Sequence, residues 1–340
     1  MIILNSAIDI HGREGTTRRN PLRITHGRIM QPKTSLFSVW MAQIRLNFLL
    51  LAVFLVAVGL AAAYRRTAGT AAEFDFFHAI LIMIGTVLAH ISVNLFNEHA
   101  DFTTRIDFDT VWTPFSGGTK MMVSGNTTPR AVMLAAVTTL ASALGIGCYF
   151  AVVSHWSILI VALTGALSIV LYTPLFQRMM VGEFFAGLTL GSLVVVGTYI
   201  AMTARPGTAL AQVLPPGVLL ISVPPGILTF LLLLINEFPD IEADRKGGRR
   251  HLVTRFGRQK AAYIYAIGLG LTFATITALP FLGAASKWIL LALIPLPLAF
   301  DTGFTAIRHH GDRNRIVHAM GKNVLIVLGT DLLMAVGILI

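Results

Sequence analysis

The stretch FFHAILIMIGTVLAHISVNLFNEHAD, residues 76–101, decides the fold, because a long apolar run ends there in Asn97-Glu98-x-x-Asp101. The same ending recurs 139 positions further along, where a second apolar run stops at NEFPD, residues 236–240. A helix needs roughly 20 apolar residues to cross the hydrocarbon core of a bilayer. Both stretches therefore predict a membrane-spanning helix that ends in a polar, acidic segment.

The composition of the whole chain agrees with this prediction. Of its 340 residues, 55% are hydrophobic and only 12% are charged, and the mean hydropathy is +0.75. Such values are typical of chains that cross a bilayer repeatedly. Nine apolar runs are long enough to be spans: 46–64, 76–97, 130–153, 157–174, 183–203, 216–236, 260–282, 286–306 and 323–340. We therefore expect an all-α membrane protein with nine transmembrane helices in a bundle.

The first 45 residues differ from the rest of the chain. Residues 1–45 are polar and basic, and they hold no apolar stretch before a small-residue cleavage site, so a cleaved signal peptide is not expected. We expect a disordered cytosolic tail here. The transmembrane domain then covers residues 46–340, with aspartate-rich cytosolic loops at 97–129 and 236–259.

Lys and Arg are unevenly distributed between the two ends of the predicted helices. With the amino terminus inside, 22 of the 26 fall on the inner side, and only Arg65, Arg66, Arg205 and Lys287 fall outside. This positive-inside pattern places the N-terminus and both acidic segments in the cytoplasm. The net charge of +10 then reflects topology and attraction to anionic lipid, not nucleic-acid binding. We expect an integral protein of the inner or plasma membrane whose active site faces the cytoplasm.

Polar residues before and within each acidic segment repeat at helical spacing, which lays them along one face of each helix. These residues are His90, Asn94, Asn97 and Asp101 in the first helix, and Asn236, Asp240 and Asp244 in the second. Asp107 and Asp109 follow the first set. If the two sets meet, each pair of carboxylates about 5 Å apart repels by roughly 3 kcal/mol at an effective dielectric of about 20. A cation must therefore lie between them.

Mg²⁺ is the cation that we expect, because it takes hard oxygen ligands and shares them between carboxylates and substrate phosphates. The sequence has no Gly-x-x-x-x-Gly-Lys-[Ser/Thr] motif and no dinucleotide fingerprint, so a nucleotide is not the expected source of the phosphates. A diphosphate carried on an isoprenoid chain fits both the metal and the membrane. Arg105, Lys120 and Arg178 lie in the predicted cytosolic loops and are placed to neutralise its remaining charge.

At these residues the sequence resembles the UbiA-type intramembrane prenyltransferases. That family carries Asn-Asp-x-x-Asp-x5-Asp after its second helix and Asp-x-x-x-Asp after its sixth, in a nine-helix bundle. Here the segments read NEHADFTTRID from 97 and NEFPDIEAD from 236, with Glu98 in place of the usual Asp, and the resemblance spans residues 40–340. It implies metal ligation by Asn97, Asp101, Asp107, Asp240 and Asp244, diphosphate binding by Asn94, Arg105, Lys120, Arg178 and Asn236, and cation stabilisation by Tyr172, in LYTPLFQRMMVGE.

A second stretch is similar to one branch of this family. PFSGGTKMMVSG, residues 114–125, looks most like the branch that prenylates 1,4-dihydroxy-2-naphthoate in menaquinone synthesis. The resemblance implies a polyprenyl diphosphate donor and an aromatic acceptor, which meet in the lipid bilayer. Other acceptors within the family are 4-hydroxybenzoate, homogentisate, a haem ring and a glyceryl lipid.

Two other classes of protein share parts of the pattern. A secondary transporter with duplicated halves would also repeat Asn and Asp, but its acids should lie near the membrane midplane and not at helix ends. A CDP-alcohol phosphotransferase would concentrate its acids in one Asp-x-x-Asp-Gly-x-x-Ala-Arg block, which the sequence lacks. Asp301 and Asp331 lie inside predicted spans, where charges are costly and mark candidate functional positions. The sequence assigns neither of them a role.

Overall fold

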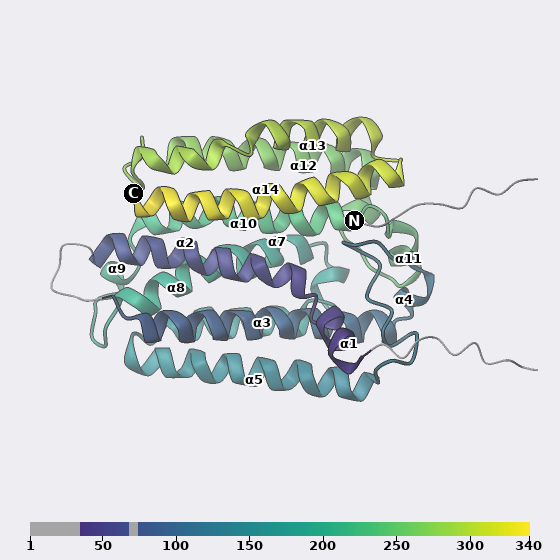
Figure 1. Cartoon of the computed structure of the whole chain (residues 1–340), viewed down its shortest axis with the longest axis horizontal. Coiled ribbons are helices and arrows are strands. Elements are labelled where there is room, and N and C mark those ends of the chain that lie inside the picture. Colours follow the sequence, from purple (N-terminus) through teal and green to yellow (C-terminus); the bar gives the residue numbers. More distant parts are fainter. Residues whose placement is uncertain (1–34, 68–73) are drawn as a thin grey trace, which may run out of the picture. The chain divides into compact units, whose positions relative to one another are not determined.

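The computed structural model describes residues 35–67 and 74–340, and these ranges contain helices, turns and irregular segments but no β-strand (Figure 1). The expected all-α fold is therefore confirmed. In chain order the helices are α1 Leu36–Gln43, η1 Leu46–Phe48, α2 Leu49–Thr67, α3 Phe76–Thr103, α4 Ile106–Asp109, α5 Pro129–Val153, α6 Ser157–Leu171, η2 Phe176–Arg178, α7 Gly182–Ala186, η3 Gly187–Ser192, α8 Leu193–Thr203, α9 Leu210–Val213, α10 Pro216–Asn236, α11 Ile241–Lys246, α12 Leu252–Ala278, η4 Lys287–Leu293, α13 Leu296–His309 and α14 Arg313–Leu339.

Eight helical segments of the described chain are long and apolar enough to cross a membrane. They are Leu46–Thr67, Phe76–Thr103, Pro129–Val153, Gly182–Thr203, Pro216–Asn236, Leu252–Ala278, Lys287–His309 and Arg313–Leu339. The predicted span 157–174 corresponds to α6, which has only 15 residues. At 1.5 Å per residue it is about 22 Å long, shorter than a bilayer core of about 30 Å. It ends at Leu171 because Thr173 precedes Pro174, and the residue before a proline disfavours helical geometry.

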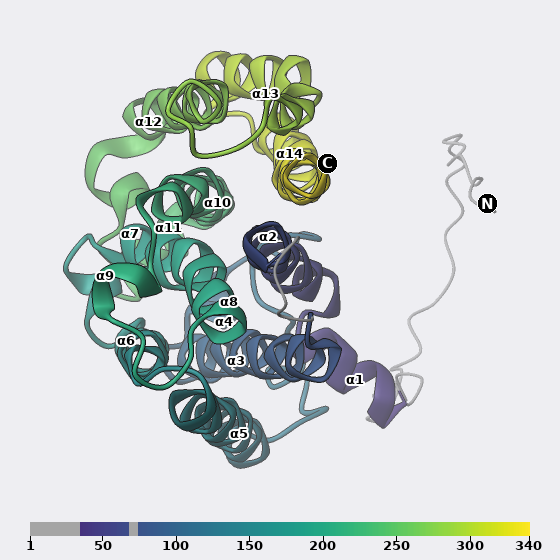
Figure 2. The same cartoon turned by 90° about the vertical axis from the view of Figure 1, so that its left-hand side faces the viewer.

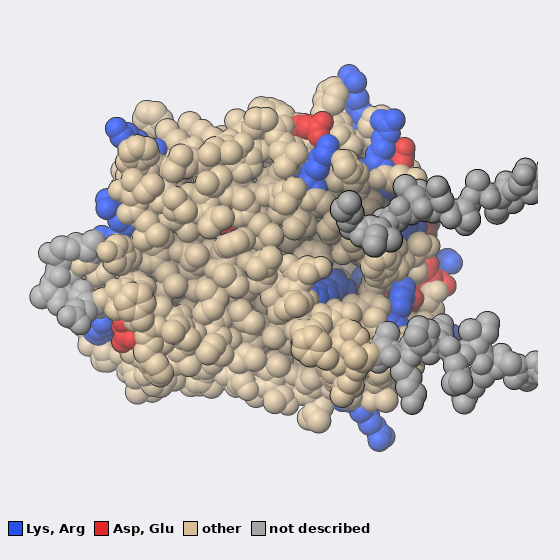
Figure 3. All heavy atoms as spheres, in the orientation of Figure 1, with Lys and Arg blue, Asp and Glu red and all other residues tan. Residues whose placement is uncertain are grey.

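The surface divides into a wide apolar belt and two charged ends (Figure 3). Large hydrophobic side chains point outward along the helices, as Phe76, Leu134, Leu163 and Phe300 do. Exposed apolar surface of this extent is costly in water and suits a lipid environment. The protein is therefore an integral membrane protein.

Several predicted boundaries differ from the observed ones. The expectation of a disordered tail up to residue 45 is wrong for Leu36–Gln43, which forms α1 with the Ser35 hydroxyl accepting a hydrogen bond from the Ser38 N–H at 3.1 Å. Residues 1–34 of the predicted tail lie outside the described ranges. The last predicted span, 323–340, is the end of α14, which begins ten residues earlier because Asp312 caps it.

Small residues allow a close approach that positions the site. The π-helical segment η3 lies against α10 and joins α7 to α8. The end-on view shows α7 and α8 on the same side of the bundle as α10 (Figure 2). A Cβ atom added at Gly191 would lie 2.8 Å from Gly226 Cα and 2.9 Å from the Pro225 carbonyl oxygen. Only glycine permits backbones to approach this closely. The contact therefore fixes α10, whose last residue is Asn236, beside α7.

Replacing Gly191 by alanine should destabilise the bundle, because the new methyl group meets backbone atoms that cannot rotate away. Overpacking of this kind costs about 1–3 kcal/mol. The matched control is Gly270→Ala on the exposed face of α12, where a Cβ atom has nothing within 4 Å. Thermal unfolding in detergent should show a lower midpoint for Gly191→Ala than for Gly270→Ala, and equal midpoints would contradict the close contact.

Candidate functional site

A cavity of about 190 Å³ lies between the C-terminal ends of α3 and α10 and the residues just before α12. Both acidic segments line it. The segments come from positions remote in the sequence, yet the structure brings five of their residues to this one space. The lining includes Asn97, Asp101, Asp107, Asp240 and Asp244. The predicted convergence of the two acidic segments is thus present in the structure.

The end of α3 presents the first polar stripe to the cavity. His90, Asn94, Asn97 and Asp101 all line it, as their spacing predicts. The Asn97 amide donates to the Asp101 carboxylate at 3.2 Å, and the Asn94 amide donates to the carbonyl oxygen of Ile44 at 2.9 Å. Asn97 and Asp101 are therefore candidate metal ligands, while Asn94 attaches the chain before α2 to α3.

The second stripe is not a single helix, so the prediction of one continuous helical face is wrong there. Helix α10 ends at Asn236, and Asp240 is instead the residue directly before the short helix α11. Pro239 accounts for the break, because proline lacks an N–H and clashes with the preceding helical turn. The turn still directs Asn236, Asp240 and Asp244 into the cavity.

One guanidinium group connects the two segments. Arg249 forms ion pairs with Asp101, from α3, and with Asp244, from α11, where Nη1 lies 2.9 Å from Oδ1. All three side chains are largely buried, with 13% of Arg249 exposed. The positive φ of 79° at Gly248 turns the chain toward the cavity. Sequence reasoning missed Arg249, and the Gly247-Gly248 pair before it was the available signal.

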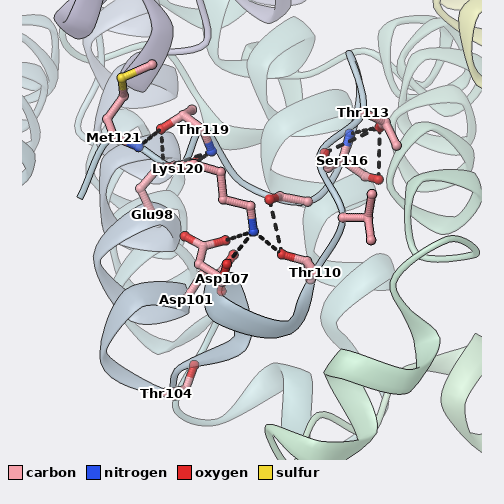
Figure 4. Close-up of polar contacts among 12 residues, drawn as sticks. Glu98, Asp101, Thr104, Asp107, Thr110, Thr113, Ser116, Thr119, Lys120 and Met121 are labelled. Atoms are coloured by element: carbon pink, nitrogen blue, oxygen red, sulfur yellow. Dashed lines mark hydrogen bonds and ion pairs between the residues drawn. The ribbon is translucent and has the colours of Figure 1, made fainter. Parts of the chain in front are cut away.

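Asp107 is held by the loop that follows α4 (Figure 4). The Lys120 ammonium contacts the Asp107 carbonyl oxygen and the Thr110 hydroxyl, and it lies 3.8 Å from Asp107 Oδ1. Gly118 has a φ of 68°, and a Cβ atom there would clash with the Asp107 carboxylate. Burial, together with the Asp101 and Glu98 carboxylates, raises the pKa of Asp107 to about 7.

The same loop reaches the second segment. Ser116 and Gly117 lie beside Asp240 in the cavity lining, and both act to lower the pKa of its carboxyl group. Burial raises the pKa of Asp240 to about 6, and the nearby charge of Asp244 acts in the same direction. Residues 113–118 therefore connect the two acidic segments from one side of the cavity, while Arg249 connects them across it.

Glu98, which stands where the family has Asp, does not line this cavity. It is buried, accepts hydrogen bonds from the Thr119 hydroxyl at 2.7 Å and the Thr119 N–H at 3.2 Å, and forms an ion pair with Arg45 at 2.9 Å. Figure 4 shows Glu98 and Thr119 beside each other at the start of the Lys120 segment. The Glu98 side chain therefore attaches the segments that contain Arg45 and Thr119 to α3, and Arg45 supplies its counter-charge.

The other predicted residues lie in different places. Tyr172 and Asn236 line the cavity. Arg105 does not, and its guanidinium lies 5.2 Å from the centre of the Phe108 ring. Arg178 lines a separate pocket beside Arg249. Their assigned roles in diphosphate binding and catalysis stay predictions.

Asp301 and Asp331, which the sequence left without a role, lie outside this cavity. The half-exposed Asp301 pairs with Lys322 at 2.5 Å. Asp331 is fully buried within α14, and neither of its carboxylate oxygens has a hydrogen-bond partner among the described residues.

A further charged cluster next to the cavity was not predicted. His251 Nδ1 lies 3.0 Å from Glu237 Oε2, and its Nε2 lies 3.1 Å from Asp244 Oδ2. Glu183 completes the cluster, with one ligand atom each of Glu183, Glu237 and His251 within 4.8 Å of one another. Burial opposes charge on the His251 ring, but the Glu237 and Asp244 carboxylates raise its pKa to about 10. Burial also raises the pKa of Glu237 to about 8, although His251 opposes this shift.

The cavity offers oxygen atoms that fit a hard cation. Several buried oxygens in its lining have no hydrogen-bond partner among the described residues: Asn97 Oδ1, Asp107 Oδ1, Asn236 Oδ1 and Asp240 Oδ1. Buried polar atoms are rarely left unpaired, so unpaired oxygens from both segments indicate a missing partner. A set composed of carboxylate and amide oxygens suits Mg²⁺ better than it suits zinc.

Replacing Arg249 by methionine should destabilise the metal-free protein, because Asp101 and Asp244 would lose their shared counter-charge. Removing one partner of a buried ion pair costs about 3–5 kcal/mol. Thermal unfolding in EDTA should show this loss, and added Mg²⁺ should restore part of it. Arg245→Met, at a half-exposed side chain of α11, is the control. A melting midpoint for Arg249→Met equal to that of the control would contradict the bridge.

An all-helical membrane fold with two acidic segments at one end of the bundle defines a class of intramembrane enzymes, and comparison with known proteins identifies the family. The UbiA prenyltransferase family model matches residues 52–320, and the chain belongs to this family. It is therefore a prenyltransferase.

Relatives and solved structures agree with this assignment. The chain is 28% identical to a 1,4-dihydroxy-2-naphthoate octaprenyltransferase of Bacillus subtilis (strain 168), over 78% of this chain and 82% of that protein. It is 27% identical to the protein of the same name from Escherichia coli (strain K12), over 76% and 82%. Its fold resembles that of a UbiA homolog from Archaeoglobus fulgidus bound to GPP and Mg²⁺, with a TM-score of 0.58 and 15% identity, covering 87% of this chain and 99% of that chain.

Proposed function

We propose that this prenyltransferase transfers a polyprenyl group from its diphosphate to an aromatic acceptor, 1,4-dihydroxy-2-naphthoate, in an Mg²⁺-dependent reaction of menaquinone synthesis. The observation that carries the proposal is the convergence of the two acidic segments on one buried cavity. The names of the Bacillus subtilis and Escherichia coli relatives support the acceptor. The GPP and Mg²⁺ bound by the Archaeoglobus fulgidus homolog support the donor and the metal.

The residues that would hold Mg²⁺ are Asn97, Asp101, Asp107, Asp240 and Asp244. When bound, the metal would neutralise the diphosphate and stabilise it as a leaving group. Arg249 lines the cavity and pairs with Asp101 and Asp244, whereas Lys120 lines a neighbouring pocket and contacts the Asp107 backbone. We assign both cations to the phosphate oxygens. Positive side chains from two separate segments, Lys120 and Arg249, would thus lie beside the diphosphate.

The rest of the cavity suits the carbon half of the donor. Tyr172 lies in the lining, where an aromatic face stabilises a neighbouring carbocation. Apolar side chains from α2, α3 and α10 continue the lining away from the acidic end, including Leu51, Val93, Leu232 and Leu233. An apolar wall keeps water from the allylic cation, which water would otherwise quench.

We assign the prenyl tail to a second, apolar pocket. This pocket lies between α3, α5, α6 and α8 and shares His90 and Leu190 with the first cavity. Its wall is rich in small residues such as Gly85, Gly147 and Gly165. A chain of isoprene units therefore has an apolar path from the acidic site into the bundle.

The proposed topology follows the distribution of basic residues. The N-terminus and the acidic cavity lie on the cytoplasmic side of the inner or plasma membrane, and α6 completes a set of nine helices. Cysteine labelling from each side of sealed vesicles tests this orientation.

Asp101→Asn and Asp240→Asn should each reduce prenyl transfer at least 100-fold, because each removes one carboxylate from a different segment of the shared site. Vesicles receive labelled geranylgeranyl diphosphate, Mg²⁺ and a panel of aromatic acceptors, and the product is quantified. Asp109→Asn is the control, since its half-exposed side chain pairs with Lys246 at 3.3 Å and does not line the cavity. Activity that survives either of the first two substitutions would contradict the assigned roles.

Gly165→Phe should lower activity with donors that carry a long prenyl chain more than activity with short ones. A Cβ atom at Gly165 has nothing within 4 Å, so a phenylalanine would extend into the second pocket without a backbone clash. The ratio of kcat/KM for geranylgeranyl diphosphate to that for dimethylallyl diphosphate should fall about 10-fold or more, in line with the loss of a few buried methylene contacts. Gly145→Phe on the exposed face of α5 is the control. An unchanged ratio would show that the prenyl tail does not occupy the second pocket.

A further inference from the structure

The cavity contains one carboxylate that the metal and diphosphate roles leave unused. Among the described residues, five carboxyl-bearing side chains line it: Asp101, Asp107, Glu237, Asp240 and Asp244. Four of them belong to the candidate metal set. Glu237 is the fifth, and only 9% of it is exposed. Burying a carboxylate is costly, so its place in the wall of an active site requires a partner.

The two glutamates of the repeated Asn-Glu-x-x-Asp pattern have different surroundings. Glu98 is closed off by Arg45 and Thr119 and does not line the cavity. Glu237 Oε2 lies 3.0 Å from His251 Nδ1 but has no hydrogen-bond partner among the described residues, and Glu237 lies in the cavity wall with Tyr172 and Gln177. The same sequence pattern therefore yields one structural glutamate and one that faces the reaction space.

His251 holds Glu237 in place. Its ring lies between Glu237 Oε2, at 3.0 Å, and Asp244 Oδ2, at 3.1 Å, and its backbone N–H and side chain form a capping box with Thr254 at the start of α12. A ring fixed on both nitrogens and at its backbone has little freedom to rotate. It therefore fixes the Glu237 carboxylate relative to the second acidic segment.

This part of the wall accepts hydrogen bonds. Glu237 is a carboxyl group, and the neighbouring Gln177 Oε1 is buried without a hydrogen-bond partner among the described residues. An acceptor-rich wall is complementary to O–H donors. The aromatic substrates of the proposed reaction carry hydroxyl groups, whereas the prenyl diphosphate carries none.

We propose that Glu237 accepts a hydrogen bond from a ring hydroxyl of the aromatic acceptor and that His251 positions Glu237 to do so. This inference rests on the proposed function and adds the residue that recognises the acceptor. The hydrogen bond increases the electron density of the ring and orients one ring carbon toward C1 of the prenyl group. Glu237 is then a catalytic residue, and His251 is a positioning residue.

The bonds and electrons of the step balance without another reagent. The bond between prenyl C1 and the diphosphate oxygen breaks, and its electron pair leaves with the diphosphate. The ring carbon supplies the pair that forms the new carbon–carbon bond. That carbon then loses a proton to an oxygen of the released diphosphate, or loses CO2 where it carries a carboxylate, and the ring becomes aromatic again. Glu237 keeps the hydroxyl hydrogen bond throughout and ends the step unchanged.

A second metal site is the competing role for this cluster, because Glu183, Glu237 and His251 are close enough to share an ion. The contacts argue against it. Both His251 nitrogens already have partners within the protein: Nε2 hydrogen-bonds Asp244 Oδ2 at 3.1 Å, and Nδ1 accepts the Thr254 N–H at 3.4 Å. Glu183 Oε1 accepts the Leu252 N–H at 2.7 Å, so only its Oε2 has no hydrogen-bond partner among the described residues.

The test compares Glu237→Gln, Glu237→Ala and His251→Gln with the control Glu242→Gln, whose side chain is 72% exposed. Purified protein in lipid nanodiscs receives geranylgeranyl diphosphate, Mg²⁺ and either a dihydroxynaphthoate or its O-methyl ethers. Binding of a non-hydrolysable thiodiphosphate donor analogue is measured in parallel, together with the metal content of the purified protein.

We expect Glu237→Ala to raise the acceptor KM or lower kcat by about 10- to 100-fold, the loss typical of a buried hydrogen-bond donor left without its partner. Its preference for hydroxyl over O-methyl acceptors should fall by a similar factor, while donor-analogue binding stays within about 2-fold of wild type. Glu237→Gln should show a smaller effect and His251→Gln an intermediate one.

If Glu237→Ala kept wild-type kinetics, wild-type preference for hydroxyl over O-methyl acceptors and intact donor binding, the role of Glu237 would be wrong. The proposed function of the protein would still stand. Metal lost on Glu237→Ala, with unchanged acceptor discrimination, would also overturn the role of Glu237 in favour of a second metal site. If the wild-type protein transferred no prenyl group to any hydroxylated aromatic compound, the proposed function itself would fail.

Discussion

Repulsion among buried carboxylates is the constraint on which the site depends. Asp101, Asp107, Asp240 and Asp244 come from two remote segments and share one small cavity, where water screens their charges poorly. Arg249 pairs with one aspartate of each segment and makes this arrangement stable. The cavity is therefore organised for strong positive charge, whether a guanidinium group or a metal ion together with its diphosphate supplies it.

The helical bundle places this charged end directly above an apolar interior. Close contact between η3 and α10, at Gly191 and Gly226, fixes the end of α10 and so the start of the second acidic segment. Apart from the polar residues of α3, the lining includes apolar side chains from α2 and α10, among them Leu51, Leu232 and Leu233. A prenyl diphosphate has the same two-part character, with a charged head and an apolar chain. The fold thus matches the substrate along its length and excludes water where the cation forms.

Local properties of the sequence were sufficient to predict the helices and the acidic segments, because hydrophobic length and carboxylate spacing are read within one element. Tertiary contacts decided the rest. Arg249 is one of several basic residues between 245 and 260, and only the left-handed turn at Gly248 sets it apart. Glu98 and Glu237 occupy equivalent positions in the repeated pattern, yet Arg45 and Thr119 close off one while His251 holds the other at the cavity. Which partner closes off each glutamate depends on tertiary packing, which residue spacing within one segment does not specify.

The most direct measurement is a structure of the protein in a lipid nanodisc with Mg²⁺ and a non-hydrolysable prenyl diphosphate analogue. We expect carboxylate oxygens from both acidic segments to coordinate the Mg²⁺ bound to the diphosphate, with metal–oxygen distances of about 2.0–2.1 Å. Density showing the diphosphate and its metal held by only one segment, with the other still facing Arg249 alone, would contradict it.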